Sequence, residues 1–254
     1  MIERLKEWFR RGSASNQPEP LARLNTLEKS LGFSIPPKDQ PIFTQALRHR
    51  SIVDSELYES HETYERLEFL GDAVLDLIVT EILFEKYPTE NEGFLTKLRS
   101  KIVKGDTLAT IAESLEFHNV LEVGERSSGQ GIEYSKSILA DVYESVIAAI
   151  YISKGYSFTF SFVLNNVNRF LDFDTLENKI DNYKSVLMEH FQSENAALPS
   201  YKVISEEGPG HDKTFLVAVF FDGEKLGEGS GKSKKKAEQV AAKNAIEKLG
   251  FSKK

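Results

Sequence analysis

The sequence predicts an all-α domain over residues 23–171, followed by a small α+β domain over residues 180–250. Apolar residues recur at three- and four-residue spacing through the first segment, which is the spacing of helices that bury one face. In the second segment the apolar residues alternate, and helical spacing returns only at its two ends. The expected order there is helix, three strands, helix. Hydrophobic residues make up 40% of the 254-residue chain, which is enough for a core in each domain.

The segments around the helical domain are also distinguished by composition. Residues 1–22 join a short amphipathic stretch to the polar run SASNQPEP, and we expect them to form a flexible tail. Three prolines within residues 36–41 mark an early turn, because proline ends or redirects a helix. Residues 124–131 form a loop rich in glycine and serine, and residues 172–179 are predicted to link the two domains.

The elements of the second domain follow from alternation and capping. Residues 183–193 have helical spacing, and the strands are expected within residues 199–208 and 213–229. Ser233 is the predicted N-cap of the last helix, since its hydroxyl can accept from a free backbone N–H. Gly250 follows the last apolar position and is expected to end that helix.

Five acidic residues lie in strongly apolar helical sequence. Glu65, Glu68 and Asp72 are spaced i, i+3, i+7, which places them within an arc of roughly 60° on a helix. Asp141 and Glu144 share a helix face in the same way far downstream. Such like charges repel, and burying them costs more free energy, so we expect bound cations to compensate. Carboxylate oxygens suit Mg²⁺, although an exposed acidic face would explain any one of these residues alone.

A run of lysines lies at the start of the last predicted helix. Lys232 and the three lysines over residues 234–236 are at the end where the helix dipole is positive, so they reduce helix stability. The arrangement is favourable if ammonium and backbone N–H groups together bind phosphates. A solvated basic run explains the lysines equally well when they are considered alone.

Charge and composition exclude several protein classes. The net charge is −7, but residues 179–254 hold 13 lysines against 11 acidic residues, so the excess negative charge lies in the helical domain. Exposed acidic surface accounts for much of that excess. No cysteine is present, which excludes disulfides and thiol catalysis and is compatible with a reducing cytosol. We find no apolar run long enough for a membrane span, no secretory signal and no nucleotide-binding P-loop motif.

Several segments resemble the ribonuclease III family, the nucleases that cut double-stranded RNA. The resemblance extends from Leu24 to Lys248. It is carried by ERLEFLGDAVL (65–75), QALRHRS (45–51), NEGFLTKLRS (91–100), SILADVYESVIAAIY (137–151), GPGH (208–211) and SKKKAEQ (233–239). The fold that it implies is an all-α endonuclease domain followed by an αβββα double-stranded-RNA-binding domain.

The resemblance also implies a catalytic mechanism and its residues. Duplex RNA would be hydrolysed with Mg²⁺, which Mn²⁺ can replace, to 5′-phosphate and 3′-hydroxyl ends. Glu68, Asp141 and Glu144 would bind the metal, and Asp72 and Glu144 would be the catalytic residues.

Further residues match supporting positions of the family. Glu65 and Glu92 correspond to acidic positions tied to dimer contact or RNA positioning. The residues expected to bind RNA are Glu189, Gln192, His211, Lys234, Lys235 and Lys236.

The implied partners are double-stranded RNA and a second copy of the chain, with no membrane and no nucleotide cofactor. The implied substrates are precursors of ribosomal RNA and some precursors of messenger and transfer RNA, in the cytoplasm. Two other functions remain open from the sequence. One is a catalytically inactive protein that binds double-stranded RNA. The other is a scaffold whose acidic helices form only a protein interface.

Overall fold

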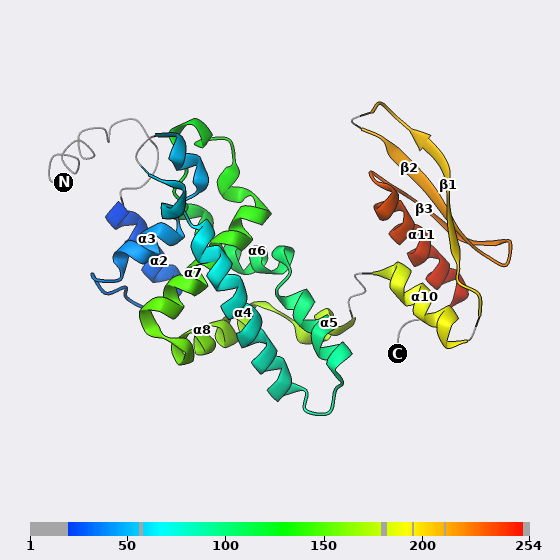
Figure 1. Cartoon of the computed structure of the whole chain (residues 1–254), viewed down its shortest axis with the longest axis horizontal. Helices are drawn as coiled ribbons and strands as arrows, with labels where there is room; N and C mark the ends of the chain where they lie inside the picture. The colour runs from blue at the N-terminus through cyan, green and yellow to red at the C-terminus, as the bar shows by residue number, and fades with distance from the viewer. Residues whose placement is uncertain (1–19, 56–57, 179–181, 195, 211, 251–254) are drawn as a thin grey trace. The chain divides into compact units, whose positions relative to one another are not determined.

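The computed structural model describes residues 20–55, 58–178, 182–194, 196–210 and 212–250 of the chain. The chain forms two compact units that divide between Glu177 and Asn178, and each is described by itself (Figure 1). Among the described residues, no helix combines the length and the apolar character needed to cross a bilayer.

The first unit is helical, which confirms the predicted all-α domain. Its α-helices are α2 (Pro20–Leu31), α3 (Gln40–Ala46), α4 (Glu65–Lys86), α5 (Glu92–Ile102), α6 (Gly105–Ser114), α7 (Lys136–Lys154), α8 (Tyr156–Phe170) and α9 (Phe173–Asn178). Helix α2, described from Pro20 on, includes residues 20–22 of the segment predicted as a tail.

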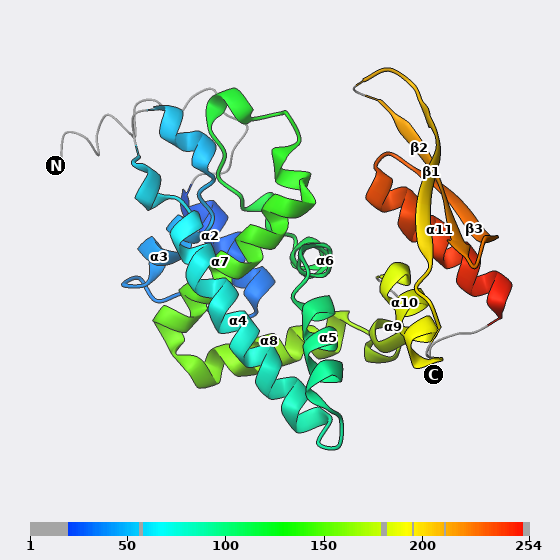
Figure 2. The same ribbon diagram turned by 45° about the vertical axis from the view of Figure 1, so that its right-hand side comes forward.

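Helix α7 is the centre of this unit. It packs against α3, α4, α6 and α8, and Figure 2 shows α4 running beside it. Val146, Ile147, Ala149 and Ile150 have no exposed surface. A helix that is apolar on most of its faces is stable only when neighbours cover it, which explains its central position.

Two helix ends differ in how well the sequence predicts them. Helix α4 ends at Lys86, because Pro88 cannot continue it. The predicted linker at residues 172–179, in contrast, contains α9, whose Leu176 is buried in the core of the first unit. The Asp172 carboxylate accepts from the Asp174 backbone N–H and starts this helix. The domain limits at 171 and 180 stay a prediction.

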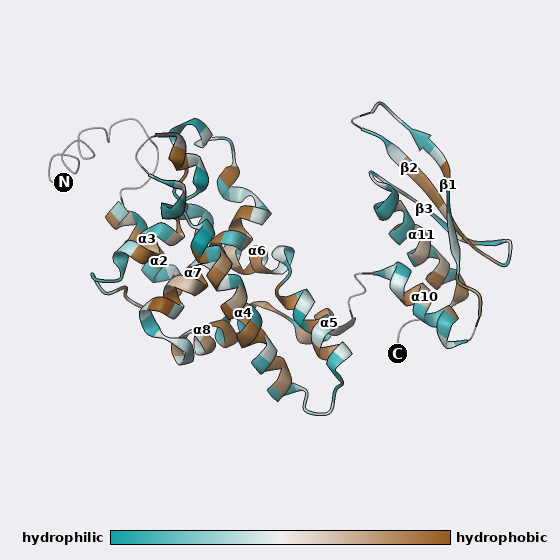
Figure 3. Cartoon of the chain, viewed as in Figure 1, coloured by the Kyte–Doolittle hydropathy of each residue, from teal (hydrophilic) through white to brown (hydrophobic). Residues whose placement is uncertain are grey.

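The second unit has the predicted helix, three strands, helix order. Its elements are α10 (Tyr183–Ser193), β1 (Ser200–Glu207), β2 (Thr214–Phe221), β3 (Glu224–Gly231) and α11 (Lys234–Leu249). The sheet is antiparallel in the order β1-β2-β3, and its central strand β2 is largely apolar (Figure 3). Helix α11 packs on β2, β3 and α10 around a small core that includes Leu187, Val219 and Ala241.

Both predicted caps of α11 are confirmed. The Ser233 Oγ accepts from the Lys236 backbone N–H at 3.2 Å. Gly250 has φ of +71°, a left-handed conformation that favours glycine at a helix end.

Candidate active site

The site begins with the close crossing of α4 and α7. A Cβ atom built at Gly71 would overlap the backbone carbonyl of Glu144, so only glycine allows the two helices to approach this closely. The crossing brings Glu68 of α4 next to the carboxylates of α7. Glycine at position 71 is therefore explained by the approach of a second backbone.

The three predicted metal ligands lie together at this crossing. Glu68, Asp141 and Glu144 each offer a carboxylate oxygen, and these oxygens lie within 4.8 Å of one another. All three side chains are half-buried. Asp72, one turn farther along α4, is exposed.

The cluster carries unbalanced negative charge. Burial, followed by the charges of Asp72 and Glu68, raises the pKa of Glu144 from its ordinary 4.5 to about 8. The pKa of Glu68 and that of Asp141 are also raised, chiefly by burial. Asp76, which the sequence gives no functional role, adds to the negative field at Glu144. Close, half-buried oxygen ligands without a matching cation are the donor set that a hard divalent ion requires, so these residues fit Mg²⁺ or Mn²⁺.

Tyr64 contacts this cluster and is missed by the sequence interpretation. Its hydroxyl donates to Asp141 Oδ2 at 3.3 Å. Burial and the nearby charges of Asp141 and Glu68 raise the pKa of the Tyr64 phenol above its ordinary value, so it remains a donor at neutral pH. Tyr64 lies four residues before Glu68, and this i, i+4 spacing could have predicted that both share a helix face.

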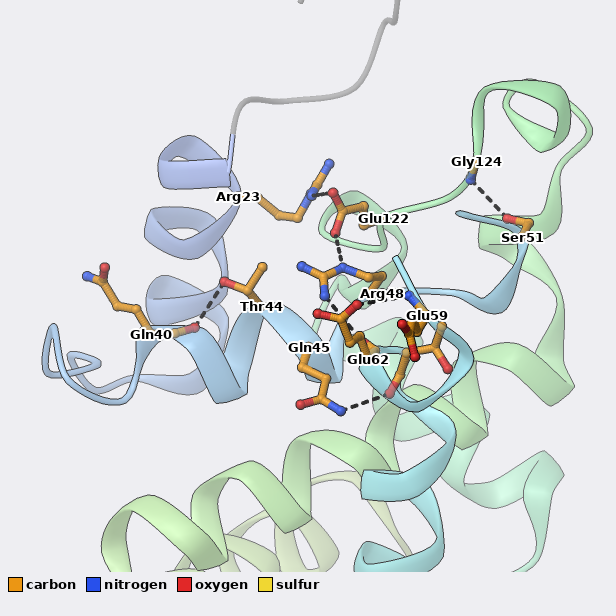
Figure 4. Close-up of polar contacts among 11 residues, drawn as sticks. Arg23, Gln40, Thr44, Gln45, Arg48, Ser51, Glu59, Glu62, Glu122 and Gly124 are labelled. Atoms are coloured by element: carbon orange, nitrogen blue, oxygen red, sulfur yellow. Dashed lines mark hydrogen bonds and ion pairs between the residues drawn. The ribbon is translucent and has the colours of Figure 1, made fainter. Parts of the chain in front are cut away.

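A polar network fixes the segment that precedes Tyr64. Glu122 receives Arg23 on one carboxylate oxygen and Arg48 on the other, each at 3.2 Å (Figure 4). Arg48 also donates to the Glu62 carbonyl at 3.0 Å, and its own carbonyl accepts from the Tyr64 N–H at 2.9 Å. The network therefore connects α2 and the 122 loop to the start of α4.

Hydrogen bonds also hold His49 and Ser51, which follow Arg48 in this segment. The His49 backbone N–H donates to the Glu122 carbonyl, and the Gly124 N–H donates to Ser51 Oγ. His49 Nδ1 lies 2.9 Å from the same Ser51 hydroxyl. Burial, followed by the charge of Arg50, lowers the pKa of His49. These hydrogen bonds give His49 and Ser51 a structural role.

The two supporting acids lie apart from each other. Glu65, in the first turn of α4, has an oxygen 3.8 Å from Arg50 Nη1. Glu92, in the first turn of α5, is exposed and accepts from the Thr96 hydroxyl at 2.8 Å.

The predicted RNA-binding residues lie on three parts of the second unit. Lys234, Lys235 and Lys236 form the exposed first turn of α11, and Lys234 Nζ lies 3.0 Å from Glu206 Oε1. Glu189 and Gln192 are exposed on α10. His211 lies outside the described residues.

A cluster of carboxylates suited to divalent metal ions lies in a helical domain. An αβββα domain follows it, and the last helix of that domain begins with lysines. This combination is typical of a nuclease that contains its own nucleic-acid-binding domain. Residues 39–170 match the family model described as Ribonuclease-III-like, and residues 183–249 match the double-stranded RNA binding motif. The chain belongs to the ribonuclease III family.

Relatives and solved structures agree with this assignment. The chain is similar to ribonuclease 3 of Chlorobaculum tepidum, at 43% identity over 84% of this chain and 79% of that protein. It is 41% identical to ribonuclease 3 of Chlorobium chlorochromatii, over 91% of this chain and 92% of that protein. The nuclease domain of Campylobacter jejuni ribonuclease III superimposes with a TM-score of 0.53, at 34% identity over 58% of this chain and 98% of that domain.

Proposed function

We propose that this chain is an endoribonuclease that cleaves double-stranded RNA with divalent ions held by Glu68, Asp141 and Glu144. Family membership and the double-stranded RNA binding motif support an endoribonuclease that acts on duplex RNA. The observation that carries the metal assignment is the approach of three carboxylate oxygens from two helices to within 4.8 Å. No observation favours a catalytically inactive protein or a scaffold.

The metal, its ligands and two neighbouring side chains would have different roles in the hydrolysis. Mg²⁺, which Mn²⁺ can replace, would supply charge neutralisation at the phosphate oxygens and a nucleophile at neutral pH. Glu68, Asp141 and Glu144 would hold it, and the Tyr64 hydroxyl would orient the Asp141 carboxylate. Asp72, exposed at the edge of the cluster, would position the attacking water. The products would carry 5′-phosphate and 3′-hydroxyl ends.

The second unit would bind the duplex by its shape. Double-stranded RNA is recognised through successive minor grooves and the phosphates between them. The lysines at residues 234–236 would bind those phosphates, while Glu189, Gln192 and His211 would face the minor grooves. Natural substrates would be precursors of ribosomal RNA and some precursors of messenger and transfer RNA, in the cytoplasm.

We also propose a homodimer formed through α4. Phe69, Leu77 and Phe84 lie on one side of this helix, and their exposed fractions are 83%, 50% and 70%. A row of large exposed apolar side chains of this kind is typical of a protein interface. In the Campylobacter jejuni domain, structural flexibility has been described in the region involved in dimer formation.

A cleavage assay tests the proposed activity. The purified chain is incubated with a duplex RNA and with its single strands, with Mg²⁺ or with a chelator, and the cut ends are mapped. We expect cleavage of the duplex only with the metal, and its loss in Glu144→Gln while RNA affinity stays within about twofold. Glu113→Gln, an exposed change on α6, is the matched control and should cleave normally. Binding without cleavage in the unmodified protein would instead identify an inactive RNA-binding protein.

A further inference from the structure

A cavity adjoins the acidic cluster on the side of residues 48–51. It has a volume of about 480 Å³, which is within the range of ligand pockets. Its lining includes three carboxylates, Glu65, Glu68 and Asp141, together with Arg50 and His49. Ser137, in the first turn of α7, completes it. Three carboxylates and one guanidinium therefore line the cavity, and divalent ions held by the cluster would offset the negative charge on its side.

Arg50 supplies that positive charge. Among the cavity-lining residues that the structure describes, it is the only arginine or lysine. Its side chain is 73% exposed, and its ion-pair partner Glu65 lies 3.8 Å away, near the limit for such a pair. An exposed pair at this distance holds the guanidinium weakly. The guanidinium can therefore turn toward an anion in the cavity at little cost.

The residues on both sides of Arg50 are nevertheless held by hydrogen bonds and an ion pair. Arg48 on one side is fixed by Glu122 and by the Glu62 carbonyl, and Ser51 on the other side accepts from Gly124 (Figure 4). A cation on a fixed backbone loses less conformational freedom on binding a ligand than one on a mobile loop. The dipole of α7 adds partial positive charge at the end where Ser137 lies.

We propose that this cavity binds a backbone phosphate of the RNA strand next to the linkage that is cleaved, with the Arg50 guanidinium as its ligand. The inference rests on the proposed function, because that function places the cleaved linkage at the adjoining carboxylates. Arginine suits the role, since its planar fork matches two phosphate oxygens at once. Glu65 would hold Arg50 in the free protein and release it to the phosphate.

Three full-length variants separate this role from general electrostatics. Arg50→Ala removes the fork, Arg50→Lys keeps only the charge, and Arg66→Ala removes a neighbouring exposed cation of α4 that does not line the cavity. We expect Arg50→Ala to lower kcat/KM on a duplex RNA by about tenfold or more, which is the scale of a hydrogen bond to a charged group. Arg50→Lys should recover part of the loss, and Arg66→Ala should stay within about twofold.

Single uncharged linkages then locate the phosphate. A series of duplexes is prepared, and each carries a single methylphosphonate at a different linkage near the cut. The sugar that precedes this linkage carries a 2′-O-methyl group. The 2′-O-methyl duplex with a normal phosphate is the control. At one linkage the penalty of Arg50→Ala should disappear, because the charge that it binds is already absent. A penalty that persists at every linkage would refute the subsite.

Two further readings keep this test independent of catalysis. RNA affinity is measured for the same pairs of Arg50→Ala and methylphosphonate duplex in a Glu144→Gln background. These affinities report on the subsite even if the unmodified chain fails to cleave. Mn²⁺ affinity without RNA, measured by calorimetry, should differ by less than about twofold between Arg50→Ala and the unmodified chain. A larger change would mean that Arg50 acts through the charge of the carboxylates, and the proposal would be wrong.

Discussion

At the scale of single residues, Glu144 makes the free energy of unfolding depend on pH. Its pKa rises from 4.5 to about 8, first because of burial and then because of Asp72 and Glu68. The folded state therefore binds more protons than the unfolded state between these two pH values. Without metal, the free energy of unfolding should fall as the pH rises through this window.

Glu144→Gln should remove this dependence. With a chelator present, we expect the melting temperature of the nuclease domain at pH 8 to rise by about 2–4 °C, the shift that roughly 1 kcal/mol gives. At pH 4.5 the variant and the unmodified chain should melt together, because both carry a neutral side chain there. Calorimetry across this pH range measures both effects, with Glu113→Gln as the control. A lower melting temperature at pH 8 would mean that the carboxylate stabilises the fold.

At the scale of helices and strands, the sequence predicts what local physics determines. The end of α4 before Pro88, the bounds of α10 and both caps of α11 follow from proline geometry, periodicity and capping groups. Helix α9 is missed because its only start signal is Asp172, in a segment of mixed polarity. Contacts between distant segments, such as Tyr64 with Asp141, depend on packing that no local pattern encodes.

The crossing of α4 and α7 gives a prediction at this scale. Gly71→Ala places a methyl group on the Glu144 carbonyl, so the helices must separate. We expect a loss of about 1–3 kcal/mol in the free energy of unfolding and a large loss of Mn²⁺ affinity, measured by denaturation and calorimetry.

Gly105→Ala is the matched control for this change. An added Cβ there lies 3.9 Å from the Ala140 Cβ, which is ordinary contact, so stability and metal affinity should be preserved. Unchanged Mn²⁺ binding in Gly71→Ala would show that the close crossing is not required for the site.

The first turn of α11 gives a second prediction. Replacing Lys234 and Lys235 with alanine should weaken binding equally across duplex sequences and reduce the slope of log affinity against log salt by roughly 1.4–1.8, if each lysine neutralises one phosphate. Lys243→Ala, farther along the same helix beside Glu247, should leave the slope unchanged. A fluorescence titration at several salt concentrations measures the slope, and an unaltered slope in the double variant would exclude phosphate binding by these lysines.

At the scale of the whole molecule, the apolar stripe on α4 predicts the assembly state. Phe84→Glu places a charge in the proposed interface, away from the carboxylate cluster, and should convert a dimer into a monomer in sedimentation experiments. Ile152→Glu introduces the same charge at a 52% exposed apolar position of α7 and should leave the dimer intact. A dimer that persists in Phe84→Glu would place the interface elsewhere.

The ion pair between Arg23 and Glu122 sets a lower limit on how far the N-terminus can be shortened. The Arg23 side chain is 4% exposed and that of Glu122 is 12% exposed, so this ion pair is largely shielded from water. Truncation after Arg23 would leave the Glu122 carboxylate paired with Arg48 alone, so the cost should be below the about 3–5 kcal/mol of a buried charge left without any partner. Trimming through Arg23 would therefore loosen the hold of Glu122 and Arg48 on the segment before Tyr64, whose hydroxyl donates to Asp141.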